Sequence, residues 1–298
     1  MIEDEEEIDQ KKHITLLPAH APTTAATKNK NRQTKRVVSR ENEKHYNTHM
    51  NSSIKPDTVK NELESNNSVT HIFINSMKRF SESLFSFITN THFKLNRLTL
   101  VDNKIVNIPT SIRQLTQLRY LILPFNNIEY LPEELADMRL ECLDLSNNSL
   151  NIDCFKVISE MKTLETLILS NNNLQGPVPP SIENCRELTF FHLNGNSISQ
   201  LPLKISLLGR LLYMDCSYTD IEYIPFTLES QLKVGVTLLF TKCTKLNPKL
   251  KEAIDKGSEE TIRYLSSHNY HIEYITNVVD NTTNMADDYR SDYQYGAV

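Results

Sequence analysis

Apolar residues recur along the middle of the chain with the same internal spacing in block after block. In each block a leucine is followed by apolar residues three, five and ten positions later, and by a polar residue eight positions later. The alternating apolar positions predict a short strand with one buried face, and the polar residue marks a turn that ends it. A repeat of 22 to 24 residues is typical of a stacked solenoid in which each repeat forms one coil. Six blocks follow this spacing, and they begin at Leu95, Leu118, Leu140, Leu164, Leu188 and Leu211.

The polar residue after each predicted strand is asparagine in every block except the last. Its amide has donors and an acceptor, so it can bond the backbone groups that lose their partners where the chain turns away. We expect each asparagine to bond its own coil and the next one, in a structural rather than a catalytic role. Thr219 stands at this position in the sixth block, and its hydroxyl should weaken the ladder there. The predicted ladder consists of Asn103, Asn126, Asn148, Asn172 and Asn196.

The second half of most blocks predicts a return segment that starts at a proline. Proline fixes its own φ and can open a short helical segment, and the apolar residue three positions later should point inward. The third block lacks this proline and reads NIDCFKVISEM, which predicts a more helical return segment. Four blocks carry an apolar residue followed by proline, namely Ile108-Pro109, Leu131-Pro132, Leu201-Pro202 and Ile224-Pro225.

These blocks resemble the leucine-rich repeat family, because six of them follow L-x-x-L-x-L-x-x-N-x-L in register. The apolar–proline form is similar to the intracellular Ras-group type, whereas LQGPVPPSI in the fourth block is similar to the plant-type variant. The resemblance implies an α/β solenoid of horseshoe shape, with short parallel strands on its concave face, helical N- and C-terminal caps and disordered tails. It also suggests signalling partners such as small GTPases, phosphatases or kinases, although no residue selects among them.

The segment before the repeats predicts a cap, because an open solenoid end exposes apolar surface. Residues 68–92 should form an N-terminal capping helix, and the alternative is that this helix docks on a partner. Its apolar stripe has helical spacing and consists of Phe73, Met77, Phe80, Leu84 and Ile88.

The repeats should occupy residues 93–247 and end in a degenerate coil before a C-terminal helical cap at 248–271. Within this cap Pro248 should open one helix, Gly257 should end it, and Ser258 should cap a second helix. The last coil is expected to run through Val236, Leu239, Thr244 and Leu246.

The two ends of the chain differ from the repeats in composition. Residues 1–67 are polar and charged and residues 272–298 are acidic, so we expect a disordered charged arm and a disordered acidic tail. The run KNKNRQTKR at residues 28–36 leaves two interpretations open, a solvated tail or a nuclear or nucleic-acid contact. A nucleic-acid partner is not the leading expectation, and a nuclear or nucleic-acid-associated protein that uses this basic arm is the alternative function.

The composition excludes several classes of protein. The chain has 298 residues and a formal net charge of -5, and no apolar run approaches the roughly 20 residues that span a bilayer. The acidic opening MIEDEEEIDQ does not resemble a secretory signal, so we expect a cytoplasmic location, with a nuclear one as the alternative. An odd number of scattered cysteines favours free thiols over disulfides. They are Cys142, Cys154, Cys185, Cys216 and Cys243.

No arrangement of residues predicts catalysis. The chain has six glycines but no phosphate-binding glycine motif, and no histidines or cysteines at the spacing of a metal site. We therefore expect no cofactor, no metal and no enzymatic activity.

The residues that face away from the core are the candidate binding surface. Strand residues alternate between two faces, so the positions between the inward leucines point outward, onto the concave side. Many are aromatic, and aromatic residues are favoured anchors in protein interfaces. High β-propensity or a tail folded over the sheet would also account for them. We expect a non-enzymatic intracellular scaffold or protein-interaction module in signalling. Its predicted contact residues are Arg97, Tyr120, Ile122, Phe125, Asp144, Ile168, Phe190, His192, Tyr213, Asp215 and Tyr218.

Overall fold

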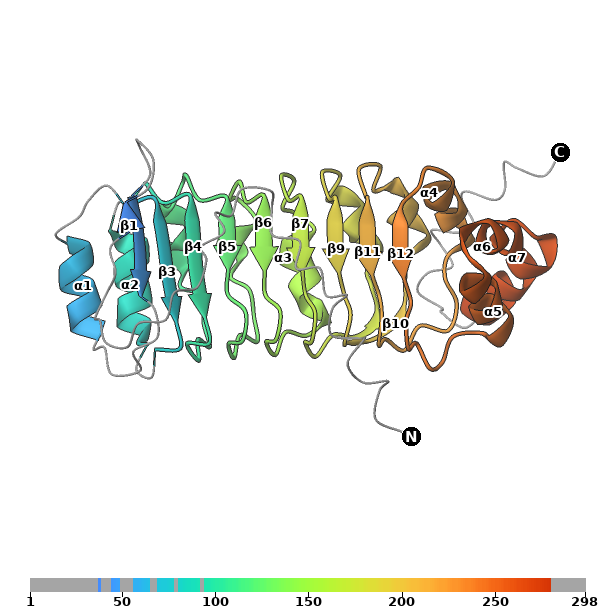
Figure 1. Cartoon of the computed structure of the whole chain (residues 1–298), viewed down its shortest axis with the longest axis horizontal. Coiled ribbons are helices and arrows are strands. Elements are labelled where there is room, and N and C mark those ends of the chain that lie inside the picture. The colour runs from blue at the N-terminus through green and yellow to red at the C-terminus, as the bar shows by residue number, and fades with distance from the viewer. Residues whose placement is uncertain are drawn as a thin grey trace, which may run out of the picture. The chain divides into compact units, whose positions relative to one another are not determined.

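A single ten-stranded sheet organises the part of the chain that the structure describes. The computed structural model describes residues 37–38, 44–48, 56–64, 69–77, 80–91 and 94–279, all of which belong to one compact unit. The strands lie side by side in chain order and pair in parallel, except that β1 and β2 are antiparallel (Figure 1). They are β1 (Val37–Val38), β2 (Lys44–Thr48), β3 (His71–Asn75), β4 (Arg97–Val101), β5 (Tyr120–Ile122), β6 (Cys142–Asp144), β7 (Thr166–Ile168), β9 (Phe190–His192), β11 (Tyr213–Asp215) and β12 (Thr237–Leu239).

Each coil runs from its strand through a turn and a return segment to the next strand, which confirms the predicted α/β solenoid. Equivalent positions of successive coils stack directly, as Leu121, Leu143 and Leu167 do in the paired register of β5, β6 and β7. All three are fully buried. Burial of a leucine side chain contributes about 1.5–3 kcal/mol, so this repeated inward column supplies much of the driving force for folding.

The predicted asparagines form a buried ladder along one end of the strands. In the coil of β5, Asn126 Oδ1 accepts from the backbone N–H groups of Asn103 (3.0 Å) and Ile105 (3.1 Å). Its Nδ2 donates to the carbonyls of Leu100 (2.8 Å) and Leu123 (3.0 Å). Each amide therefore bonds its own coil and the preceding coil, and the predicted bond to the following coil was wrong. The other members with this arrangement are Asn103, Asn148, Asn172 and Asn196.

In the last two coils the ladder positions are occupied by residues other than asparagine. Thr219 Oγ1 donates to the Cys216 carbonyl (2.7 Å), and Cys243 Sγ donates to the same carbonyl (3.1 Å). Cys243 therefore occupies the ladder position of the final coil. The predicted register of that coil was wrong by one residue, because Leu238 and Phe240 take its inward strand positions while Thr244 is exposed.

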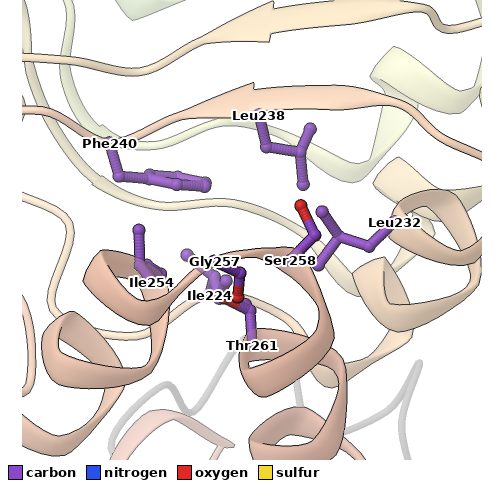
Figure 2. A pocket seen from close by; sticks show the side chains of 8 residues that line it. All are labelled: Ile224, Leu232, Leu238, Phe240, Ile254, Gly257, Ser258 and Thr261. Carbon is purple, nitrogen blue, oxygen red and sulfur yellow. Dashed lines mark hydrogen bonds between the residues drawn. The ribbon is translucent and has the colours of Figure 1, made fainter.

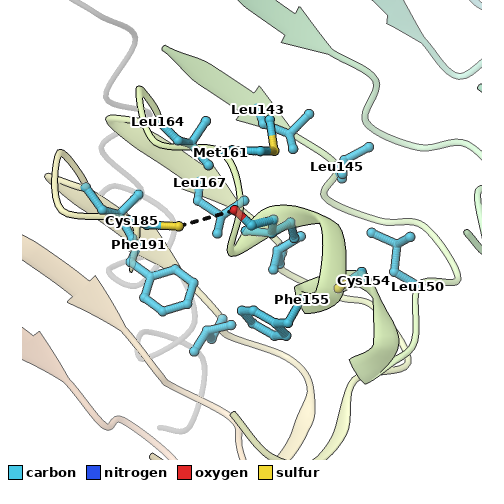
Figure 3. Packing of buried hydrophobic residues seen from close by; sticks show 14 of the residues in the cluster. Leu143, Leu145, Leu150, Cys154, Phe155, Met161, Leu164, Leu167, Cys185 and Phe191 are labelled. Carbon is cyan, nitrogen blue, oxygen red and sulfur yellow. Dashed lines mark hydrogen bonds between the residues drawn. The ribbon is translucent and has the colours of Figure 1, made fainter. Parts of the chain in front are cut away.

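The return segments are short helices, as predicted. Each of the four prolines precedes a 3₁₀ segment, and the residue three positions later is buried in every case: Ile112, Leu135, Ile205 and Leu228. The coil of β6 has no such proline and instead contains α3 (Phe155–Ile158), which confirms the more helical return segment. Figure 3 shows how α3 packs: the Phe155 ring meets the Phe191 ring edge to face, with centroids 6.5 Å apart. In the fourth and fifth blocks the residues that precede these helical segments pair in parallel as β8 (Gln175–Pro177) and β10 (Ser197–Gln200).

The predicted N-terminal helix is in fact a strand followed by a shorter helix. β3 (His71–Asn75) pairs with β4, and only α2 (Glu82–Asn90) is helical. Ile72 and Ile74 are β-branched residues at alternating positions, and both are buried like the inward leucines of the next coil. The solenoid therefore begins at least one coil earlier than predicted, and α2 is the return segment of that coil.

Part of the predicted disordered arm, residues 1–67, has regular structure. It contributes β1, β2 and the helix α1 (Pro56–Glu64), whose Val59 and Leu63 are buried. These two residues are four positions apart, the spacing that places them on one helix face. The other residues of 1–67, including the basic run at 28–36, lie outside the described residues, as do residues 280–298.

The C-terminal cap contains three helices rather than the two that were predicted. They are α5 (Pro248–Lys256), α6 (Ser258–Leu265) and α7 (His268–Tyr274), followed by one π-type turn at Ile275–Val279. Pro248 opens α5 as predicted, while Ser258 is the first residue of α6 and caps nothing. Tyr270 and Tyr274 are fully buried, so residues 272–279, expected to belong to the tail, are part of the cap.

The cap joins the last coils through a tyrosine hydroxyl and leaves a small cavity. Tyr270 Oη donates to the Ile224 carbonyl (2.6 Å) and accepts from the Ile224 N–H (3.2 Å). Beside this contact is a cavity of about 100 Å³. Figure 2 shows Leu238 and Phe240 of the last coil on one side of it and Ile254, Ser258 and Thr261 of the cap helices on the other.

Replacing one ladder asparagine should destabilise the protein. Asn172→Ala leaves the Leu150 N–H and the Leu145 and Leu169 carbonyls without this partner, so we expect the free energy of unfolding to fall by about 1–3 kcal/mol. Urea denaturation followed by circular dichroism measures the change. Asn173→Ala alters the adjacent exposed asparagine and serves as the control; an equal loss in both variants would contradict a role for the ladder.

A pair of tyrosine variants should separate the cap contact from simple packing. Tyr270→Phe leaves both backbone groups of Ile224 buried without this partner, so we expect a loss of about 1–3 kcal/mol in unfolding free energy. Tyr264→Phe removes a buried hydroxyl that has no hydrogen-bond partner among the described residues, and it should be neutral or stabilising. Thermal denaturation of the two variants checks this, and the opposite order would contradict it.

Candidate interaction surface on the sheet

The strand register brings the predicted contact residues of the strands together in two columns, which we call the outward face. The first column runs through Arg97, Tyr120, Cys142, Thr166, Phe190 and Tyr213. The second runs through Thr99, Ile122, Asp144, Ile168, His192 and Asp215. Sequence reasoning missed Phe73, which extends the second column on β3 by pairing with Thr99. The alternation of Ile72 and Ile74 was the signal that would have revealed it.

The first column carries aromatic side chains and one buried thiol. The guanidinium of Arg97 lies 4.2 Å from the centre of the Tyr120 ring, a cation–π contact. Phe190 and Tyr213 are half-buried. Cys142 is only 6% exposed although it occupies an outward position, and burial raises the pKa of its thiol to about 12. Cys142 is therefore protonated and unreactive at neutral pH.

The second column places a neutral histidine near two carboxylates. Asp144 Oδ1 accepts from the backbone N–H (2.9 Å) and the hydroxyl (2.7 Å) of Ser146, and burial raises the pKa of Asp144 above its usual value. Burial lowers the pKa of His192, against the opposing effect of Asp215 and Asp144. At pH 7 the histidine is therefore uncharged. Its ring lies 5.1 Å from that of Tyr213.

A row of residues in the left-handed conformation borders the outward face, one position before each rung of the ladder. In most coils this residue is small or polar, as with Asn147, Asn171 and Gly195. At Gly195 a side chain would meet Asn171 Oδ1 at 2.1 Å. Phe125 and Tyr218 adopt the same conformation, each with φ of 56°, and are 57% and 54% exposed. A bulky residue in this conformation lowers the stability of the folded protein by on the order of 1–3 kcal/mol.

The other features of the described residues are a cavity beneath the cap and five cysteines. The cavity beneath the cap is lined by Ile224, Leu232, Leu238, Phe240, Ile254, Gly257, Ser258 and Thr261, none of which titrates near neutral pH. No group of three metal-ligating side chains occurs in this part of the chain. Its helices are all too short or too polar to cross a bilayer. All five cysteines are free, as predicted, and all five are buried.

Comparison with known families and proteins agrees with this geometry. Residues 93–150 and 163–185 match two family models, both described as leucine rich repeat. The chain is a leucine-rich repeat protein. A leucine-rich repeat protein of Leptospira interrogans superimposes with a TM-score of 0.50 and 26% identity, over 60% of this chain and 47% of that one.

Two curated proteins match this leucine-rich repeat protein over about half of its length. Adenylate cyclase of Schizosaccharomyces pombe is 30% identical over 148 residues, or 49% of this chain and 8% of the cyclase. Epiphycan of Homo sapiens is 32% identical over 142 residues, or 47% of this chain and 41% of epiphycan. Because the chain spans less than half of either protein, the likeness concerns the repeats and not the whole relative.

Relieving the strained aromatic positions should stabilise this leucine-rich repeat protein. Phe125→Asn and Tyr218→Asn introduce the residue found at this position in other coils, and we expect each to raise the free energy of unfolding by about 1 kcal/mol. Asn171→Phe, the reciprocal change, should lower it by a similar amount. Urea denaturation of the three variants measures these effects. A loss of stability in both asparagine variants would show that packing, not strain, dominates at these positions.

Proposed function

We propose that this leucine-rich repeat protein is a non-enzymatic interaction module that binds a protein partner on the outward face. Leucine-rich repeat domains generally mediate protein–protein interaction, and the fold is typically non-enzymatic. The observation that carries the proposal is the pair Phe125 and Tyr218, which stay exposed in a conformation that favours small residues. Strain of this kind concentrates at functional sites.

The competing explanation by β-propensity covers only part of this surface. It accounts for aromatic and β-branched residues within strands, such as Tyr120, Ile168 and Phe190. It does not account for Phe125 and Tyr218, which follow their strands and have left-handed backbone. Aromatic anchors are favoured in protein interfaces, and a role in such an interface accounts for both sets.

The cellular role of the module is part of the same proposal. The Ras-group resemblance of the apolar–proline repeats supports an intracellular scaffold in signalling, with a small GTPase, a phosphatase or a kinase as the partner. The match to adenylate cyclase covers 8% of that protein and adds no catalytic group to this chain. The nuclear or nucleic-acid alternative depends on residues 28–36, which lie outside the described residues.

Acidic substitutions on the outward face should abolish partner binding. The test variant combines Tyr120→Asp, Phe190→Asp and Tyr213→Asp, because charge in the centre of an apolar interface is strongly unfavourable. A matched control places the same number of aspartates at exposed positions off the sheet: Tyr130→Asp, Leu207→Asp and Val234→Asp. Proteins captured from cell lysate by each full-length bait are identified by mass spectrometry, and circular dichroism confirms that the baits fold.

We expect a partner that the wild type and the control capture, and that the test variant loses at least tenfold. Identical partners for all three baits would contradict binding on the outward face. Loss in both variants would also contradict it, because the effect would then follow net charge rather than position.

A further inference from the structure

The positive and negative side chains of the outward face differ in the contacts they make. The one arginine of its two columns, Arg97, stacks on the Tyr120 ring, and beside the face Arg119 Nε lies 3.7 Å from Glu141 Oε1. Asp144 and Asp215 differ: among the described residues neither forms an ion pair with a lysine or an arginine. Each binds the backbone N–H two residues later, at Ser146 and Ser217, through Oδ1. The two columns therefore hold two carboxylates and one guanidinium, so their net charge at neutral pH is negative.

The two carboxylates lie within apolar surroundings at a defined separation. Asp144 on β6 and Asp215 on β11 are separated by β7 and β9, so three strand spacings place them roughly 14 Å apart. Ile168 and His192 lie between them in the same column, with Phe190 in the column beside it. His192 does not neutralise the carboxylates at pH 7, because burial lowers its pKa.

Covering such a face with a partner has an electrostatic consequence. A partner that excludes water from Asp144 and Asp215 without supplying a cation buries two unpaired charges, which is strongly unfavourable. A partner that places a guanidinium or an ammonium on each carboxylate forms charge-assisted hydrogen bonds instead. The carboxylates therefore select against neutral and acidic partners, while the aromatic side chains provide the contact area.

We propose that the outward face recognises a basic segment of another protein, which sets a lysine or arginine on Asp144, another on Asp215 and apolar side chains between them on Ile168 and Phe190. This inference rests on the proposed function, because it names the chemistry of the partner for the same face. The separation of the carboxylates corresponds to about four residues of an extended segment, at roughly 3.3 Å per residue.

A displayed library of random 12-residue peptides tests the inference without assuming a partner. The library is selected on the immobilised full-length wild type, and the selected peptides are synthesised and their dissociation constants measured by fluorescence anisotropy. The same peptides are measured on a variant with Asp144→Asn and Asp215→Asn. The matched control carries Asp137→Asn and Asp255→Asn, two exposed aspartates away from the outward face. Each peptide is also made with citrulline, an uncharged analogue, in place of arginine.

The expected result is a set of peptides with two basic residues flanking apolar ones. Their affinity should fall at least tenfold with the Asp144 and Asp215 changes and with citrulline, and less than twofold with the control. Neutral or acidic selected peptides, or basic ones that bind the Asp144 and Asp215 variant unchanged, would overturn the inference. If peptides of either kind still lose binding to a variant with Phe190→Ala and Tyr213→Ala, the outward face would remain the binding site and only the basic partner would be excluded.

Two further outcomes separate the remaining possibilities. Peptides that bind the Phe190→Ala and Tyr213→Ala variant as tightly as the wild type would overturn both the inference and the proposed function. A full-length variant with glutamine at Lys28, Lys30, Arg32, Lys35 and Arg36 tests whether the chain competes with itself. If only this variant binds peptides, the occupant of the face is the basic run of the chain itself, and the inference of an external partner is overturned.

Discussion

The turn that ends each strand determines how the coils stack. There the chain must leave the sheet, and its backbone groups lose the partners that a longer strand would provide. A residue in the left-handed conformation makes the turn, and the amide of the next residue, such as Asn126, bonds the freed groups of two coils. Because each amide also reaches the preceding coil, the same hydrogen bonds that end a strand hold the stack together.

This arrangement separates the residues that fold the protein from those that are free to bind. The inward positions are fixed by burial and the ladder positions by hydrogen bonding, so neither can vary without loss of stability. Most positions of the outward columns carry neither constraint, although Cys142 is buried and, in the left-handed row, a side chain at Gly195 would meet Asn171. Coils in a solenoid contact only their neighbours, so a side chain such as Tyr213 can be chosen for a partner with little effect elsewhere. Phe125 and Tyr218 are present even though their left-handed backbone conformation favours glycine and asparagine.

The sequence predicted the structure correctly where the leucine spacing was the only periodic pattern. It did not where a strand period and a helix period overlapped in the same segment. The register of the outward columns followed from the leucine spacing alone. Ile72 and Ile74 were missed as a strand because Phe73, Met77 and Phe80 beside them have helical spacing, and a short window satisfies both periods. The direction of the ladder could not be predicted, because an amide can bond a coil on either side. Cys243 was not recognised as a rung, since its thiol bears no resemblance to asparagine.

The carboxylates of the outward face show how a surface with few charges can still be selective. Asp144 and Asp215 each bond only the serine two residues later, so neither connects two coils. A surface of aromatic side chains alone would bind almost any apolar segment, so it would discriminate poorly between partners. Two partly buried negative charges convert that area into a surface that penalises every segment without matching cations. In the proposed complex, the aromatic anchors would supply affinity and the carboxylates specificity, from different side chains on the same strands.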